Sequence, residues 1–302
     1  YNVATGIFTA LGDSKTPLYF LIGSSVGNVA LDYLFVAVFH FGVSGVGWAT
    51  FLAQGIAGIL AVITLLRRVA KLPTGHGKVM LYSKSMLRRI AKIAVPSILQ
   101  QSFVSVGNIF IQSLVNSFGS AVIAGYSAAI KLNTFTITSF STLGNALSSF
   151  SAQNIGAAKI DRVRKGFRAG TMLAWIIAVP FFVLFFFFGN EMLRIFMENP
   201  TGGAMKAGMA FLKIVSPFYF IISLKLLADG LLRGSSAMIG FMVSTFTDLI
   251  LRVILAYVFA GLFGSTGIWM SWPVGWSISA IISLLFYRYT WKQLSVERRL
   301  LK

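Results

Sequence analysis

Long apolar runs alternate with short polar segments along the whole chain, and this pattern predicts eight membrane-spanning helices. Each run holds about 20 residues or more, which is enough for an α-helix to cross a hydrocarbon core of about 30 Å. Strands of a transmembrane barrel would be about 10 residues long with strict alternation of apolar and polar positions. These runs do not alternate. The predicted helices cover residues 17–39, 44–66, 93–116, 121–150, 169–188, 207–229, 238–262 and 267–287.

The composition agrees with this pattern. Hydrophobic residues make up 56% of the chain, charged residues 11%, and the mean hydropathy is +0.80. These values are typical of a polytopic membrane protein, so we expect an all-α fold in the plasma membrane. The sequence has no cysteine, which excludes disulfides and thiolate metal sites. No convergent set of nucleophile, acid and metal-binding residues is visible, so we do not expect an enzyme.

Basic residues are concentrated in alternate loops. The chain carries 26 basic and 8 acidic residues, and its net charge is +18. The segments 67–92, 159–168 and 288–302 are strongly basic, whereas the loops at 40–44, 117–120 and 263–266 contain no lysine or arginine. The positive-inside rule then places the basic loops and the C-terminus in the cytoplasm. Because the charges follow the membrane topology, they do not indicate a nucleic-acid partner.

A helix hairpin near the start of the chain resembles one near its end. A single offset of 222 residues superposes Gly12 on Gly234, Ser14 on Ser236, Phe41 on Phe263, Gly42 on Gly264 and Gly45 on Gly267. Chance similarity between two glycine-rich apolar hairpins is the alternative explanation. We favour an internal duplication, since transporters are commonly built from two equivalent lobes. Six crossings separate equivalent helices, so the repeat would be a parallel one.

The duplication predicts the domain organisation. Residues 1–68 would be the last hairpin of a first lobe, and residues 69–92 a cytoplasmic linker. Residues 93–290 would form a complete six-helix second lobe, followed by a basic cytoplasmic tail at 291–302. About 130 residues with four further helices would then precede this chain in a two-lobe protein, so we expect it to be a fragment.

Two consecutive predicted helices carry polar residues at helical spacing. Such groups need partners or water within the hydrocarbon region, so both polar faces should point inward. They either bond the helices to one another or line a water-filled substrate cavity, and both interpretations stay open. The candidate cavity residues are Gln100, Gln101, Asn108, Gln112, Lys131, Thr138, Ser141 and Asn145.

Four ionisable residues inside the later spans form two pairs with i, i+4 spacing. A charge at the centre of a membrane helix costs about 2.5–3.5 kcal/mol on insertion scales, so each needs a reason. Asp248 and Arg252 can neutralise each other on one helix face, and we expect a structural ion pair there. For Lys225 and Asp229 a structural and a functional role stay equally open.

One acidic residue in the first predicted span has no basic partner in its own helix. Asp32 has only Asn28 one turn earlier. It is either a hydrogen-bonded structural carboxyl or a site where a proton or Na⁺ supplies the missing partner. Asp32 with Asn28, and Asp229 with Lys225, are therefore the candidate ion-coupling residues of this chain.

Several segments resemble the multidrug and toxic compound extrusion (MATE) transporters. They are residues 6–17 (G-I-F-T-A-L-G-D-S-K-T-P), the Phe41–Gly47 turn, Pro96 followed by Gln100 and Gln101, and Ala152–Lys159 with Arg162. The resemblance implies two six-helix lobes with alternating access, and antiport of organic cations or drugs against Na⁺ or H⁺. It also implies a monomer in the lipid bilayer, with no cofactor apart from the coupling ion.

The sequence departs from one branch of that family, which carries acids on the seventh helix and in the middle of the tenth. Gln100 and Gln101 stand where the seventh helix would offer an acid, and Lys225 lies in the middle of the tenth. Another branch has an essential aspartate on its first helix, which this chain does not include. The alternative is a lipid-linked oligosaccharide flippase of the same superfamily. A flippase would need a strongly cationic cavity to hold a diphosphate, and few cations lie within the spans.

Overall fold

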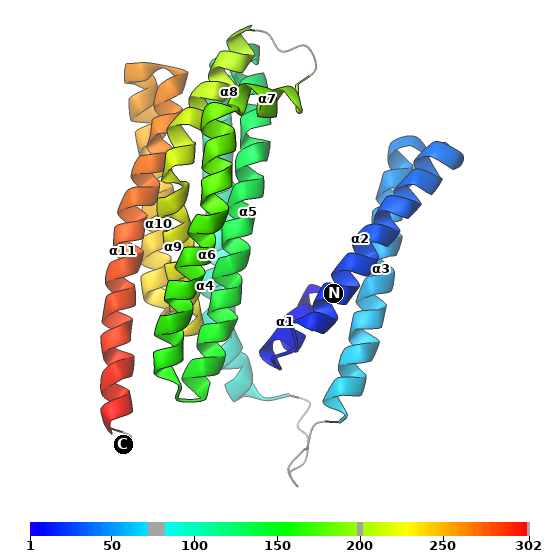
Figure 1. The fold of residues 1–302 in the computed structure, drawn as a ribbon, viewed down its shortest axis with the longest axis vertical. Helices are drawn as coiled ribbons and strands as arrows, with labels where there is room; N and C mark the ends of the chain where they lie inside the picture. Colours follow the sequence, from blue (N-terminus) through cyan, green and yellow to red (C-terminus); the bar gives the residue numbers. More distant parts are fainter. Residues whose placement is uncertain (72–81, 198–201, 301–302) are drawn as a thin grey trace. The chain divides into compact units, whose positions relative to one another are not determined.

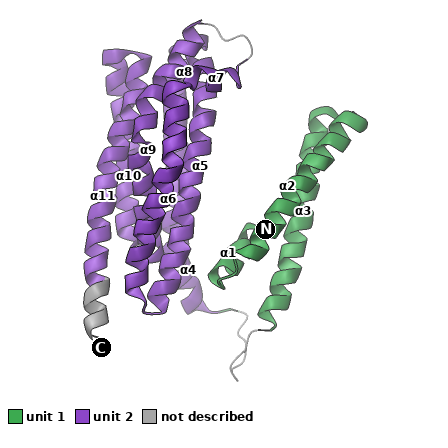
Figure 2. Ribbon diagram, in the orientation of Figure 1, with its two compact units in different colours: residues 1–82 green, residues 83–302 purple. Residues whose placement is uncertain are grey.

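The computed structural model describes residues 1–71, 82–197 and 202–300, and every regular element in these ranges is a helix (Figure 1). The chain divides into two compact units (Figure 2). Residues 1–82 form unit 1 and residues 83–302 form unit 2. Each unit is described by itself below.

Unit 1 is a helix hairpin with a short helix before it. Small residues recur at every fourth position of the second hairpin helix, where they are buried and let its partner approach closely. They are Gly45, Ala49, Ala53, Ala57 and Ala61. The helices of unit 1 are α1 (Asn2–Ala10), α2 (Lys15–Tyr33), the π-helical turn η1 (Leu34–Val38) and α3 (Gly42–Val69).

The turn between α1 and α2 is built around Asp13. Its carboxylate accepts hydrogen bonds from the Thr16 backbone N–H at 3.1 Å and from the Thr16 hydroxyl at 2.9 Å, and Arg68 of α3 lies 3.9 Å away. The hydrogen bonds from Thr16, with a smaller contribution from the charge of Arg68, hold the pKa of Asp13 below its ordinary value of 3.8. Gly12 before it has φ +82°, a conformation that favours glycine. This turn therefore accounts for the G-D-S-K-T-P segment.

Asp13→Asn is expected to lower the stability of unit 1 at neutral pH by a small amount. Because the folded-state pKa is depressed, the carboxylate stabilises the fold above pH 3.8, and this contribution is lost as the pH falls through the lower folded-state value. The unfolding temperatures of the two proteins should differ at pH 7 and converge in acid below pH 3.8. A difference that stayed constant across this range would contradict a role for the charge.

Unit 2 is a helix bundle around an aromatic core. Trp269, Tyr219, Phe140 and Phe211 are among its largest fully buried side chains. Its helices are α4 (Lys84–Asn116), α5 (Ser120–Gly156), α6 (Ile160–Phe187), α7 (Gly189–Arg194), α8 (Gly202–Val215), the 3₁₀ turn η2 (Ser216–Phe218), α9 (Tyr219–Gly234), α10 (Met238–Phe263) and α11 (Ser265–Leu300).

Each of the eight predicted spans coincides with a helical segment, but the boundaries differ. Among the described residues, 7 helical segments are long and apolar enough to cross a membrane, and α5 is not one of them. The predicted span 207–229 is α8, η2 and α9 in succession, with Pro217 inside the turn between them. Helix α4 already includes residues 84–92 of the expected linker, and α11 continues through the expected tail to Leu300. The sequence analysis did not predict the short helices α1 and α7.

The two hairpins have turns with similar backbone conformations, but no single sequence offset relates both pairs of turns. Gly42, the first residue of α3, and Gly264, just before α11, have φ +57° and +62°. The turns after α1 and α9 place Gly12 and Ser236 at positive φ, each followed by a backbone hydrogen bond back to the fifth preceding carbonyl. The offset of 222 thus relates Gly42 to Gly264. In the earlier turn, Gly12 corresponds to Ser236 instead of Gly234, so the offset is wrong by two residues there. The wide turn η1 lies between the turns of unit 1, where it accommodates additional residues. The duplication itself stays a prediction.

Candidate functional site

A cavity of about 490 Å³ lies inside unit 2 and combines polar, charged and aromatic walls. Five helices contribute to it. The residues with polar or aromatic side chains are Gln100, Gln101, Asn108 and Gln112 from α4, Tyr126, Asn133, Thr134 and Thr138 from α5, Lys225 from α9, Thr245, Asp248 and Arg252 from α10, and Trp272 and Trp276 from α11.

The structure brings five of the eight candidate cavity residues together. Gln100, Gln101, Asn108, Gln112 and Thr138 line this cavity. The other three lie elsewhere on α5. Lys131 lines a neighbouring groove that shares Thr134 and Thr138 with the cavity, and its Nζ stands 5.8 Å from the centre of the Phe196 ring. Asn145 accepts a hydrogen bond of 2.8 Å from Arg233 of α9, and Ser141 is partly buried away from the cavity.

Helices α5 and α9 approach each other closely at Gly144, next to Asn145. A Cβ atom added to Gly144 would stand 2.6 Å from the Leu226 carbonyl oxygen, and one added to Gly230 would overlap the Gly144 carbonyl. Helices α5 and α9 therefore touch at this level and leave no open space. Polar residues of α5 beyond that point, such as Asn145, meet neighbouring side chains instead of a cavity.

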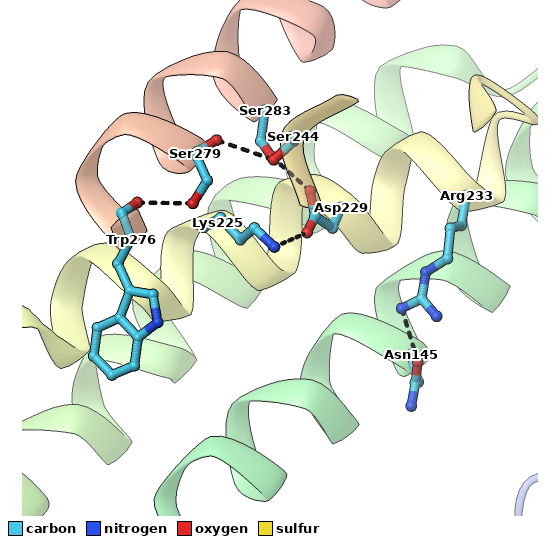
Figure 3. A network of polar contacts seen from close by, with 8 residues as sticks. All are labelled: Asn145, Lys225, Asp229, Arg233, Ser244, Trp276, Ser279 and Ser283. Carbon is cyan, nitrogen blue, oxygen red and sulfur yellow. Dashed lines mark hydrogen bonds and ion pairs between the residues drawn. The ribbon is translucent and has the colours of Figure 1, made fainter. Parts of the chain in front are cut away.

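Lys225 and Asp229 form a buried ion pair at the edge of the cavity (Figure 3). The Lys225 Nζ lies 2.7 Å from the Asp229 Oδ2, and the two residues are 4% and 3% exposed. The Ser283 hydroxyl donates to Asp229 Oδ1 at 2.6 Å and is itself hydrogen-bonded to Ser244. Both carboxylate oxygens are thus satisfied, as buried charges require. Lys225 lines the cavity, and Asp229 lies behind it.

The predicted ion pair between Asp248 and Arg252 is not formed. Both side chains line the cavity and are more than nine-tenths buried, at 6% and 7% exposure. The Arg252 guanidinium lies over the ring of Trp272, 4.6 Å from its centre, which is a cation–π arrangement. Asp248 packs against the backbone of α11 at Gly275, and its Oδ1 has no hydrogen-bonding partner in the described part of the chain. Contacts with α11 therefore prevail over the i, i+4 pairing that one helix alone would favour.

The candidates of unit 1 do not pair with each other. Asn28 donates a hydrogen bond of 3.3 Å to the Thr50 hydroxyl of α3. Asp32 is partly buried, and its Oδ1 lacks a hydrogen-bonding partner among the residues that the structure describes. The hydrogen-bonded structural carboxyl, one of the two interpretations of Asp32, is therefore not seen at this oxygen.

The sequence analysis missed the aromatic part of the site. Trp272 and Trp276 form one wall of the cavity, with ring centres 5.7 Å apart in an edge-to-face arrangement. Tyr126 lies at the same cavity and stacks on Trp269 at 5.0 Å. The available signal was the spacing of Trp269, Trp272 and Trp276 at intervals of three and four, which puts all three on one helix face.

The long apolar helices and the open polar cavity between them are typical of a polytopic membrane protein with a binding space among its helices. A family model described as MatE matches residues 96–258, which is more than half of the chain. The chain belongs to the MatE family.

Relatives in this family carry names that refer to drug export. The "Probable multidrug resistance protein YpnP" of Bacillus subtilis is 31% identical over 301 residues, covering 98% of this chain and 66% of its own length. The "Multidrug export protein MepA" of Staphylococcus saprophyticus is 23% identical over 280 residues, with 92% and 61% covered. This chain therefore spans less than two thirds of the length of these relatives.

Solved structures share the fold. "Outward-facing conformation of a multidrug resistance MATE family transporter of the MOP superfamily" aligns with a TM-score of 0.88 at 20% identity, covering 97% of this chain and 66% of that one. "Reverse polarity of binding pocket suggests different function of a MOP superfamily transporter from Pyrococcus furiosus Vc1" aligns with a TM-score of 0.87 at 19% identity, with 97% and 66% covered. At these identities the likeness concerns the fold alone.

Proposed function

We propose that this chain is part of a MATE-type multidrug efflux transporter, and that the cavity of unit 2 takes part in substrate binding. The observation that carries the proposal is the cavity itself. Charged and amide side chains line about 490 Å³ of space between helices of a membrane protein, where polar groups are costly and mark substrate or ion paths. The names of the relatives YpnP and MepA support the same activity.

The transport cycle would be alternating access of two six-helix lobes, with organic cations and drugs exported in exchange for Na⁺ or H⁺. The basic loops support a cytoplasmic C-terminus, and we propose a monomer in the plasma membrane. Apart from the coupling ion, no cofactor is required. A flippase is not favoured, because Lys225 is neutralised by Asp229 and Lys131 lies outside the cavity.

The coupling carboxylate of this chain would be Asp32 or Asp229. Both oxygens of Asp229 already have partners, whereas Asp32 Oδ1 has none among the described residues, which favours Asp32 between the two. Full ion-coupled export by Asp32→Asn and by Asp229→Asn in the whole protein would instead place the coupling acid in helices that precede this chain. The family branch with an aspartate on its first helix supports that third outcome, and we consider it the leading one.

Efflux by the whole protein in everted membrane vesicles tests the function. A fluorescent organic cation should accumulate when either an Na⁺ or a pH gradient is imposed, and the effective gradient identifies the coupling ion. Asn108→Leu removes a polar group from the cavity wall and should slow accumulation by about fivefold, the equivalent of one lost hydrogen bond. Asn190→Leu makes the same change at an exposed position of α7 and serves as the control. Folded protein that accumulates no probe under either gradient would refute the proposal.

A further inference from the structure

A second groove, of about 600 Å³, runs along the surface of unit 2 between α6 and α9. The polar cavity is lined by other residues of α9. Met172 is 67% exposed and Ile176 60%, so the groove is open along its outer side. An open apolar groove along a helix of membrane length is a surface that a hydrocarbon chain can fill. Its apolar and aromatic walls contain Met172, Trp175, Ile176 and Val179 from α6, and Phe220 and Leu224 from α9.

The groove has the length of one membrane leaflet. Its α6 side extends over residues 168–179, which is a rise of about 16 Å at about 1.5 Å per residue. Half of a hydrocarbon core of about 30 Å is about 15 Å. Both uncharged polar side chains of this stretch are satisfied inside the protein. The Trp175 indole N–H donates to the Phe220 carbonyl at 3.2 Å, and the Thr171 hydroxyl donates to the Phe167 carbonyl at 2.9 Å. This stretch therefore suits an apolar chain.

Positive charge gathers at one end of the groove. Arg168 lines that end, is exposed, and takes no part in the ion pairs found among the described residues. Arg164 lies one turn earlier on the same face of α6, with Lys165 next to it. Asp161 is the acid in this part of the helix, so the net charge here stays positive. The basic loops support a cytoplasmic position for this end, and the cytoplasmic leaflet is the one that carries anionic lipids.

We propose that the groove binds one anionic phospholipid of the cytoplasmic leaflet, with an acyl chain along α6 and the phosphate on Arg168. A guanidinium can donate two parallel hydrogen bonds to a phosphate, and basic sites between membrane helices bind anionic headgroups. A zwitterionic phospholipid brings its own ammonium group close to Arg164 and Arg168, and this repulsion opposes its binding. The lipid is therefore recognised by its net negative charge. This inference concerns the lipid partner of unit 2 and does not depend on the transported solute.

Quenching of Trp175 by brominated lipids tests the proposal. The whole protein is placed in phosphatidylcholine bilayers that contain an equal small fraction of either phosphatidylglycerol or phosphatidylcholine with brominated acyl chains. Bromine quenches indole fluorescence on contact, and the difference between the protein and its Trp175→Phe variant isolates the signal of Trp175. Brominated phosphatidylglycerol should bind at least about fivefold more tightly, the equivalent of one basic residue near the membrane surface. Equal quenching by the two lipids, or none by either because a protein segment covers the groove, would overturn the inference.

A matched pair of variants separates this groove from a general attraction of anionic lipids to the basic surface. Arg168→Gln should lower the preference for phosphatidylglycerol at Trp175 by about fivefold. Arg168→Lys should keep part of the preference, because it keeps the charge and loses only the planar fork of the guanidinium. Arg162→Gln removes the same charge from an exposed position on another face of α6, so it should change the preference little. Equal losses in Arg162→Gln and Arg168→Gln would indicate diffuse attraction and would contradict a site at Arg168.

Discussion

Lys225→Met is expected to destabilise unit 2 by about 3–5 kcal/mol, because it removes one partner of a buried ion pair and leaves the other charge uncompensated. Asp229 is 3% exposed, so water cannot replace the ammonium group that lies 2.7 Å from its Oδ2. The Ser283 hydroxyl would remain as a neutral donor to Oδ1 only. Unfolding of the whole protein in mixed micelles, followed by the fluorescence of the buried tryptophans, measures the loss.

The double variant Lys225→Met with Asp229→Leu separates the pair from its surroundings. Replacing both charges by apolar groups of similar size is often close to neutral, so most of the stability lost in the single variant should return. Lys213→Met removes a lysine from an exposed position of α8 and should change stability by less than about 0.5 kcal/mol. A double variant as unstable as the single one would show that the Ser244–Ser283 network depends on the carboxylate for its own geometry.

The helices of this protein could be predicted from its sequence because they are set by local patterns. Apolar runs of membrane length, glycine turns such as Gly42 and Gly264, and loop charges all act over a few residues. Three of the candidate cavity residues on α4, Gln101, Asn108 and Gln112, line one cavity, as their helical spacing suggests. Periodicity within one helix suffices for that conclusion.

The partners of the charged residues could not be predicted in the same way. The spacing of Asp248 and Arg252 describes α10 alone, whereas their actual neighbours, Gly275 and Trp272, belong to α11. The i, i+4 pair is worth only a few tenths of a kcal/mol, so a cation–π contact and close helix packing outweigh it. Lys225 and Asp229 do pair as their spacing suggests, with Ser283 of α11 supplying a further contact that no local pattern reveals.

The close contact between α5 and α9 depends on glycines that periodicity does not distinguish from any other small residue. Gly144, Gly230 and Gly234 lie where α5 and α9 touch, and a Cβ at any of them would meet backbone atoms of the opposite helix. Gly261 of α10 faces open space, although its sequence context is equally apolar. Which glycines serve helix contact is therefore a property of the tertiary packing.

Gly230→Leu is expected to prevent the normal packing of unit 2, and Gly230→Ala to cost about 1–3 kcal/mol through overpacking. The added Cβ would overlap the carbonyl group of Gly144, which is backbone and cannot move aside as a side chain could. Forcing α9 away from α5 would also displace Lys225 and Asp229, which precede Gly230 on the same helix and adjoin it in the case of Asp229. Thermal unfolding of the whole protein, together with the efflux assay, should therefore show a loss of both stability and transport.

Gly261→Ala gives the matched control for this prediction. It makes the same change in the interior of a helix of unit 2, at a site with no heavy atom within 4 Å of the new Cβ. Alanine has a higher helix propensity than glycine, so this variant should be unchanged or more stable by up to about 1 kcal/mol. The two alanine variants thus differ in sign as well as in size. Equal unfolding temperatures for Gly230→Ala and the unaltered protein would mean that α5 and α9 do not touch at Gly144.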